Sequence, residues 1–165
     1  MLFMYKRIGV LLILITVLLA GCSSSYVSDK EIISDENSYT YRKCNDTGST
    51  SNSLNRAFEG FDGKDTIWML DAENKASITV KISTTLDKGK FKVLLVTNDN
   101  DIVTLLENDG TYEQNIELEA GTSRIIIVGD NSSGVCQIAF SDVENVTIKN
   151  TSSKIDFDDW FDDWF

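Results

Sequence analysis

The feature that most restricts the fold of this chain is a period-two alternation of apolar and polar residues. In the stretch ASITVKIS, Ile78, Val80 and Ile82 fall on one side, and serine, threonine and lysine side chains fall on the other. The stretch YEQNIELE repeats the pattern with glutamates on its polar side. Such alternation is typical of β-strands with one buried and one solvent-facing side. No long helical pattern interrupts these runs between residues 38 and 150, so we expect an all-β domain.

Short clusters of turn-forming residues divide this region at the spacing of β-hairpins. The clusters are DKG before Phe91, NDND before Ile102, NDG before Thr111, EAG before Thr122 and DNSSG before Val135. The run RIIIVG is apolar on both sides, which predicts a central position in a sheet. We therefore expect a single antiparallel β-sandwich of about eight or nine strands, with a jelly roll as one candidate topology. The predicted strands lie near 38–44, 54–60, 65–71, 76–84, 89–97, 101–107, 111–119, 122–129 and 134–149.

The chain begins with a short basic and apolar segment. Lys6 and Arg7 precede an uncharged apolar run over residues 8–20. As a helix this run would span about 20 Å, which is less than the ~30 Å hydrocarbon core of a bilayer. A basic start, a short apolar middle and small residues at its end are typical of a secretory signal peptide. The last four residues of the segment, Leu19-Ala20-Gly21-Cys22, resemble the lipobox of bacterial lipoproteins at every position.

The lipobox resemblance implies cleavage between Gly21 and Cys22 and a diacylglyceryl group on the Cys22 thiol. Two or three acyl chains would then hold the protein firmly on a membrane. Ser23 stands where the inner-membrane retention signal of diderm bacteria has Asp, so we expect another location for the lipid. That location is the outer face of the cytoplasmic membrane in a monoderm, or the outer membrane in a diderm. The predicted parts are a signal peptide at 1–21, a polar tether at 22–37, a β-sandwich at 38–150, and a linker and tail at 151–165.

Two cysteines remain once Cys22 is lipidated. Cys44 and Cys136 would then lie outside the cytoplasm, where disulfides are permitted. A bridge that closes so long a loop would stabilise the fold by about 4 kcal/mol in the chain-entropy model. Cys136 alternates in phase with Ile138 and Phe140, which predicts that it faces the core. The alternatives at this stage are a Cys44–Cys136 disulfide and two separate buried thiols.

Charge and composition exclude several classes of function. The net charge is −11, so a nucleic acid partner is not expected, because phosphate binding needs concentrated lysine and arginine. Anionic headgroups would also repel this surface, which leaves the lipid anchor as the contact with the membrane. The chain has no histidine, which removes Ser-His-Asp and Cys-His catalysis and most zinc sites. No GxSxG motif, phosphate loop or dinucleotide fingerprint occurs, and we expect neither enzymatic activity nor a cofactor.

A pair of acids near aromatic residues is the remaining candidate for catalysis. Glu59 and Asp62 lie close in sequence to Phe58, Phe61 and Trp68. Glycosidases need only two carboxylates, and aromatic rings can stack on a sugar. In the alternative, which we favour, the aromatic residues belong to the core and the acids flank a turn. We therefore predict no catalytic residue.

Two clusters of oxygen-bearing side chains are candidates for calcium binding. One is Asn98-Asp99-Asn100-Asp101, and the other consists of Asp62 and Asp65. Hard cations take such ligands, but neither cluster has the spacing of a twelve-residue calcium loop. Asn and Asp are also common in tight turns for backbone reasons alone. We therefore interpret both clusters as turns and predict no metal site.

The last ten residues, DFDDWFDDWF, combine aromatic side chains with pairs of acids. The spacing i, i+3, i+4, i+7, i+8 predicts one face of a short amphipathic helix. That face consists of Phe157, Trp160, Phe161, Trp164 and Phe165. Like charges at i, i+4 and the short length would make this helix unstable alone, so we expect it to form against a surface. The candidate surfaces are the protein's own sandwich, a basic-rimmed groove of a partner protein, and the lipid bilayer.

These features together predict a non-catalytic binding or interaction module at the cell envelope, with an envelope protein as partner through the tail. Three alternatives make different demands on the structure. A glycan-binding module would place exposed aromatic residues on one concave face of the sheet. A small envelope enzyme would need two carboxylates about 5–10 Å apart in a cleft. A purely structural lipoprotein would keep its tail packed permanently on its own domain.

Overall fold

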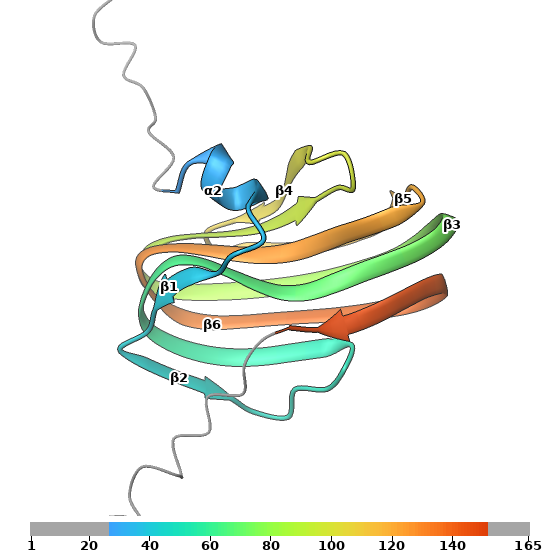
Figure 1. The fold of residues 1–165 in the computed structure, drawn as a ribbon. Coiled ribbons are helices and arrows are strands. Elements are labelled where there is room, and N and C mark those ends of the chain that lie inside the picture. Colours follow the sequence, from blue (N-terminus) through green and yellow to red (C-terminus); the bar gives the residue numbers. More distant parts are fainter. Residues whose placement is uncertain (1–26, 152–165) are drawn as a thin grey trace, which may run out of the picture.

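The computed structural model describes residues 27–151, which form an antiparallel β-sheet with one short helix (Figure 1). The elements are α2 (Asp29–Ile33), β1 (Ser38–Thr40), β2 (Lys43–Asp46), β3 (Ser53–Val96), β4 (Ile102–Glu107), β5 (Gly110–Leu118) and β6 (Gly121–Asn150). Every other strand pairs with β3, so all of them belong to one sheet. No helix within residues 27–151 is long and apolar enough to cross a membrane.

The sheet is folded double along a line of bends that crosses all of its strands. The bends lie at 41–42, 60–63, 87–90, 108–109 and 130–133, and the strand register places them side by side. We call this the fold line, and Figure 1 shows the long ribbons turning over there at the left. Gly63, Gly89 and Asn131 have φ angles of 98°, 79° and 46°, left-handed conformations that glycine and asparagine adopt more readily than other residues.

The fold line replaces several predicted hairpins. The clusters DKG, NDG and DNSSG all lie on it, and the chain continues beyond each bend instead of reversing. Residues 79–86 pair with 134–141, and residues 90–96 pair with 124–130 beyond the bend. The antiparallel all-β class is confirmed, but eight or nine separate strands are not what the chain forms, because several of them run on through the bends. NDND does form a turn, in which the Asn100 N–H donates to the Thr97 carbonyl at 3.0 Å.

Two layers lie on either side of the fold line. We call one the open layer, and it consists of 43–46, 53–59, 76–86, 110–118 and 134–141. The other, the helix-covered layer, consists of 38–40, 64–72, 90–96, 102–107, 121–129 and 146–150. Apolar side chains from both layers form the main core between them. Ile78, Val80 and Ile82 are buried there, which confirms the prediction made from their alternation.

A second apolar cluster lies on the outer face of the helix-covered layer. Val27 and Ile32 are buried there against side chains of β3 and β6. This cluster explains why RIIIVG is apolar on both sides. Ile125 and Ile127 face the main core, whereas Ile126 belongs to the cluster under α2. The central position predicted for this run is therefore confirmed, and α2 is what buries its second side.

Two buried cations hold the segment that contains α2 against the sheet. The Lys64 Nζ donates to the carbonyl oxygens of Glu31 at 3.1 Å and Ser34 at 2.5 Å. The Arg124 guanidinium donates to the carbonyl oxygens of Ile33 at 2.7 Å and Ser34 at 2.8 Å. These carbonyls belong to the last turn and C-cap of α2, where the helix dipole is negative.

The prediction of a polar tether over 22–37 is therefore wrong from residue 27 onward. Residues 27–35 are a folded part of the domain because Val27 and Ile32 are buried and both cations bind the segment. The signal peptide at 1–21, its cleavage site at Gly21 and the lipidation site Cys22 lie outside the described residues. The tail residues Phe157, Trp160, Phe161, Trp164 and Phe165 also lie outside them.

Candidate binding groove

The candidate site lies on the outer face of the open layer. An open groove of about 780 Å³ runs there beside the fold line, and we call it the fold-line groove. A second hollow of about 410 Å³ lies further along the same strands. Successive strand residues point to opposite faces, so Leu54, Arg56 and Phe58 are buried inward while Ala57 and Glu59 point to the groove. Among the described elements, α2 covers the outer face of the helix-covered layer, and none covers the outer face of the open layer.

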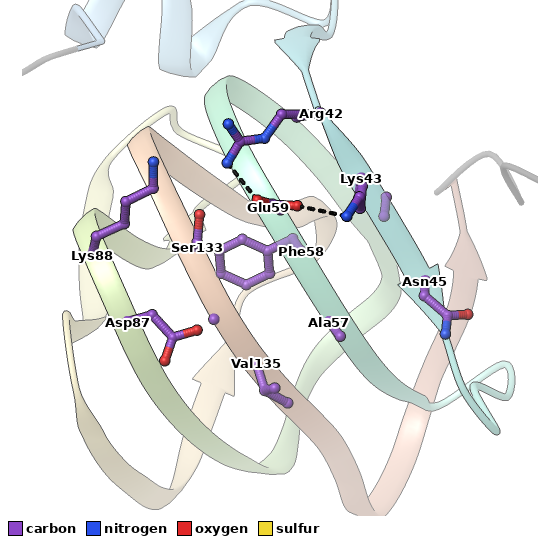
Figure 2. A pocket seen from close by; sticks show the side chains of 12 residues that line it. Arg42, Lys43, Asn45, Ala57, Phe58, Glu59, Asp87, Lys88, Ser133 and Val135 are labelled. Atoms are coloured by element: carbon purple, nitrogen blue, oxygen red, sulfur yellow. Dashed lines mark hydrogen bonds and ion pairs between the residues drawn. The ribbon is translucent and has the colours of Figure 1, made fainter.

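The groove has an apolar floor between polar walls. Ala57 and Val135 form the floor, and the Val135 side chain is 40% exposed. Gly134 adds no side chain there, because a Cβ at this position would lie 2.2 Å from the Thr85 carbonyl oxygen. Figure 2 shows the walls, which come from the β2 side and from the segment that contains Asp87. The wall side chains are Arg42, Lys43, Asn45, Asp87 and Lys88.

Two cations bind the Glu59 carboxylate in the groove, and a third, Lys88, lies on the opposite wall. Glu59 Oε1 accepts a hydrogen bond from Arg42 Nη2 at 2.5 Å, and Glu59 Oε2 lies 3.3 Å from Lys43 Nζ. The hydrogen bond with Lys43, followed by the charges of Arg42 and Lys88, holds the pKa of Glu59 below its usual range. Asp87 is the second acid of the lining. The lining thus has more cations than acids on a chain with a net charge of −11, which favours a further anionic group in the groove.

The structure does not bring the candidate carboxylate pair, Glu59 and Asp62, together in the groove. Glu59 lines the groove, whereas Asp62 lies within the bend at 60–63 and pairs with Thr40 of β1. A carboxylate with a lowered pKa is ionised at neutral pH, so Glu59 has no proton to donate as a general acid. Phe58 is 5% exposed, and Phe61 and Trp68 are fully buried, which confirms the interpretation of these aromatic residues as core.

The candidate calcium ligands are also not brought together. Residues 97–101 form the hairpin turn between β3 and β4, and the Asn98 amide donates to the Ala120 carbonyl at 3.1 Å. Asp65 is buried and binds Arg56, whereas Asp62 is exposed. Within residues 27–151, no group of three or more Cys, Asp or Glu side chains is gathered as a metal site would need.

Of the two alternatives for the cysteines, the structure has free thiols at Cys44 and Cys136 and no disulfide between them. Cys44 lies opposite Phe58 on one side of β3, and Cys136 lies opposite Arg56 on its other side. Their backbones are therefore two strand spacings apart, about 9.5 Å. Cα atoms more than about 7 Å apart cannot be bridged without movement of the backbone. Cys136 does face the core, as its alternation predicted.

A buried ionic network lies directly behind the groove and was not predicted from the sequence. Arg56 donates to both carboxylate oxygens of Asp46, at 2.6 and 2.7 Å, and to Asp65 Oδ2 at 2.8 Å. The Tyr41 hydroxyl donates to the same Asp65 oxygen at 3.1 Å. Burial raises the pKa of Asp65 and Arg56 opposes that shift. Because Asp46 belongs to β2, this network fixes the strand that forms one wall of the groove.

A signal for this network was available in the sequence. Arg56 lies in phase with Leu54 and Phe58, the inward side of a predicted strand, and a buried arginine needs acidic partners. The position of those partners depends on the pairing of β1 and β2 with β3, which alternation alone does not reveal.

Phe58 is the aromatic residue in the lining of the groove, and at 5% exposure it offers no exposed aromatic surface. Every aromatic residue between 27 and 151 is buried or half-buried. Tyr41, Phe61, Phe58 and Phe91 stack on one another within the core, with ring centroids 4.5 to 6.1 Å apart. The exposed aromatic face that a glycan-binding module was expected to show is therefore not present among these residues.

Comparison with known proteins gives structural neighbours only. No protein-family model and no curated protein matches the chain. An exo-β-1,3-galactanase from Phanerochaete chrysosporium, solved with galactose, matches 65% of this chain at 12% identity and a TM-score of 0.36. A CBM4 protein matches 69% of it at 8% identity and a TM-score of 0.34. The CBM22-1 xylan-binding domain from Paenibacillus barcinonensis matches 70% of it at 10% identity and a TM-score of 0.30.

The match covers 28% of the galactanase chain, 79% of the CBM4 chain and 86% of the xylan-binding domain. At these TM-scores and identities the ligands of the three proteins are no argument about this chain.

Proposed function

We propose that this protein is a lipid-anchored extracytoplasmic lipoprotein whose folded domain is a non-catalytic binding module. Its fold-line groove takes an acidic polypeptide segment of an envelope protein. The observation that carries this proposal is the excess of cations over acids in the groove on an uncovered sheet face, where Arg42, Lys43 and Lys88 accompany Glu59 and Asp87.

The chemistry of the groove favours a polypeptide ligand. Its cations suit the carboxylates of Asp and Glu, and the apolar floor of Ala57 and Val135 suits a neighbouring apolar side chain. A sugar polymer is disfavoured because the described part of the groove has no exposed aromatic side chain on which sugar rings could stack. The lowered pKa of Glu59 supports binding over acid catalysis, because the site offers fixed charges without a proton donor.

The short link to the anchor also supports an outward-facing groove. With Cys22 lipidated, five residues would lead from the anchor to Val27, a reach of at most about 17 Å. Val27 is buried against the helix-covered layer, so that layer would lie next to the membrane. The fold-line groove is on the outer face of the other layer and would face away from the lipid.

Site-specific photo-crosslinking in the full lipoprotein tests the binding role. A photoreactive residue at Val135 lies in the groove, and the same residue at Val103, which is 44% exposed on β4, is a matched control in the other layer. We expect protease-sensitive adducts of higher mass from Val135 only, and their loss in a Lys88→Glu variant. Protease-resistant adducts would indicate a glycan, and equal adducts from both positions would refute the groove as the binding site.

The lipid anchor has its own test. Cys22→Ala should move the protein from the membrane fraction to the soluble fraction, because the acyl chains would be absent. An unchanged membrane fraction would contradict lipidation at this residue.

A further inference from the structure

We propose that the fold-line groove has an occupant within the same chain, the acidic-aromatic segment 155–165, which a ligand has to displace. This inference rests on the binding role proposed for the groove and adds its regulation. The point where the described chain ends, the length of chain beyond it and the charges on both sides support this occupant.

The described chain ends on the edge of the sheet that borders the groove. The Thr151 N–H donates to the Ile67 carbonyl at 2.9 Å, and its hydroxyl donates to the Thr66 carbonyl at 2.7 Å. Residues 146–150 pair with the same side of β3 that β1 and β2 occupy further along the strand. β2 is also a wall of the groove, so the described chain ends on the same edge of the sheet as that wall.

The remaining chain is long enough to make this connection. Five residues, 152–156, separate Thr151 from Phe157 and span at most about 18 Å when extended. The two layers are about 10 Å apart, which this linker can cross at the edge. The nine residues 157–165 then extend over as much as about 30 Å, enough to follow the groove along its strands.

The charges of the segment and the groove are complementary. Asp158, Asp159, Asp162 and Asp163 would face a lining that holds three cations and two acids. Arg42 and Lys43 already pair with Glu59, whereas Lys88 forms no ion pair within residues 27–151 and donates to Asn131 Oδ1 at 3.4 Å. Elsewhere on the open layer, Lys75 pairs with Glu117 and Lys81 with Glu113, each at 2.7 Å. Lys81 and Glu113 both line the second hollow, which therefore has less to offer an acidic segment than the fold-line groove.

Aromatic side chains of the segment would cover the apolar floor of the groove. Large aromatic residues gain more from burial than any other side chains, but ordering ten residues costs a comparable amount. Docking within one chain is helped by the high effective concentration of a short linker. The balance is marginal, and an acidic ligand with more contacts can therefore displace the segment. The groove would then bind only ligands that outcompete the chain's own tail.

Photo-crosslinking in the full chain tests this occupancy directly. With p-benzoylphenylalanine at Val135, we expect an intramolecular link to a peptide within residues 155–165, identified by mass spectrometry after digestion. With the same residue at Val103, we expect none. Replacing Asp158, Asp159, Asp162 and Asp163 with asparagine should lower the yield of the link at least tenfold, and Lys88→Glu should lower it as well. Circular dichroism confirms that each variant remains folded.

The outcomes separate this inference from the proposed function. Mixing ¹⁵N-labelled and unlabelled protein shows whether the link forms within one chain, and a link only between chains would overturn the inference. Absence of the link, with adducts to other proteins still formed at Val135, would also overturn it and would leave the binding role intact. A link that disappears in the asparagine variant while adducts to other proteins increase would support both.

Discussion

Replacing Arg56 with methionine should destabilise the domain by removing the cation from a buried ionic network. The Arg56 side chain is 1% exposed and binds Asp46 and Asp65, whose side chains are 23% and 2% exposed. Removing one partner of a buried ion pair costs about 3–5 kcal/mol, because an uncompensated charge stays in the interior. Asp46 can regain water, whereas Asp65 cannot. We therefore expect a loss near the lower end, about 3 kcal/mol.

The loss should depend on pH in a defined direction. Burial raises the pKa of Asp65 even with Arg56 present, and without that cation the folded-state pKa rises further. The folded state then holds a proton at pH values where the unfolded carboxyl, with a pKa of about 3.9, has lost it. Stability of the variant therefore falls as pH rises through the interval between these two pKa values. The deficit should be largest at pH 7 and smaller at pH 4.5.

Urea unfolding followed by circular dichroism measures both effects. The wild type and Arg56→Met are compared at pH 7 and pH 4.5, with similar m-values as evidence that the unfolding transition is the same. A second variant, Arg56→Met with Asp65→Asn, removes the buried charge and should recover about 1–2 kcal/mol at pH 7. A loss below 1 kcal/mol at pH 7, or an equal loss at both pH values, would refute the reasoning.

Three further predictions concern the cysteines, the fold line and α2. Cys44 and Cys136 should both be alkylated after denaturation without reductant. In the folded state Cys44 should react slowly at pH 8, because burial raises the pKa of its thiol to about 11. A protein mass 2 Da lower, with no alkylation, would reveal a disulfide. Gly89→Ala should lower the free energy of unfolding by at least about 2 kcal/mol more than Gly48→Ala. Both glycines have positive φ, but only a Cβ at Gly89 would clash with backbone, 2.5 Å from the nearest atom. Equal losses in urea unfolding would contradict this. Lys64→Met should speed hydrogen exchange in residues 27–35 more than tenfold, because the ammonium group that donates to their carbonyl oxygens is lost. Unchanged exchange there would show that Lys64 does not hold α2.

Strand positions were predictable because alternation is a local property. Ile78, Val80 and Ile82 point to the core wherever the strand lies in the sheet, so their burial follows from spacing alone. The core interpretation of Phe58, Phe61 and Trp68 was predictable for a related reason, since large aromatic residues gain most from burial.

The bends were not predictable in the same way. A turn residue such as Gly89 permits a left-handed backbone in a hairpin and in a bend alike. Whether the chain forms a hairpin or a bend at Gly89 depends on the neighbouring strand. Residues 130–133 of that strand bend beside Gly89, so both strands continue together past the fold line. The role of α2 also escaped prediction, because a five-residue helix carries too little periodicity and is held by Lys64 and Arg124 from distant strands.

The groove follows from side-chain size at the fold line. On the outer face of the open layer, the middle strands carry Ala57, Gly134 and Val135, while the flanking segments carry Arg42 and Lys88. Short side chains between long ones leave a channel without a gap in the sheet. The inward side of the same strand carries Arg56, whose bonds to Asp46 hold β2 in place and with it one wall of that channel. Loss of the buried network should therefore weaken groove binding as well as stability, and binding at a fixed folded fraction would separate the two effects.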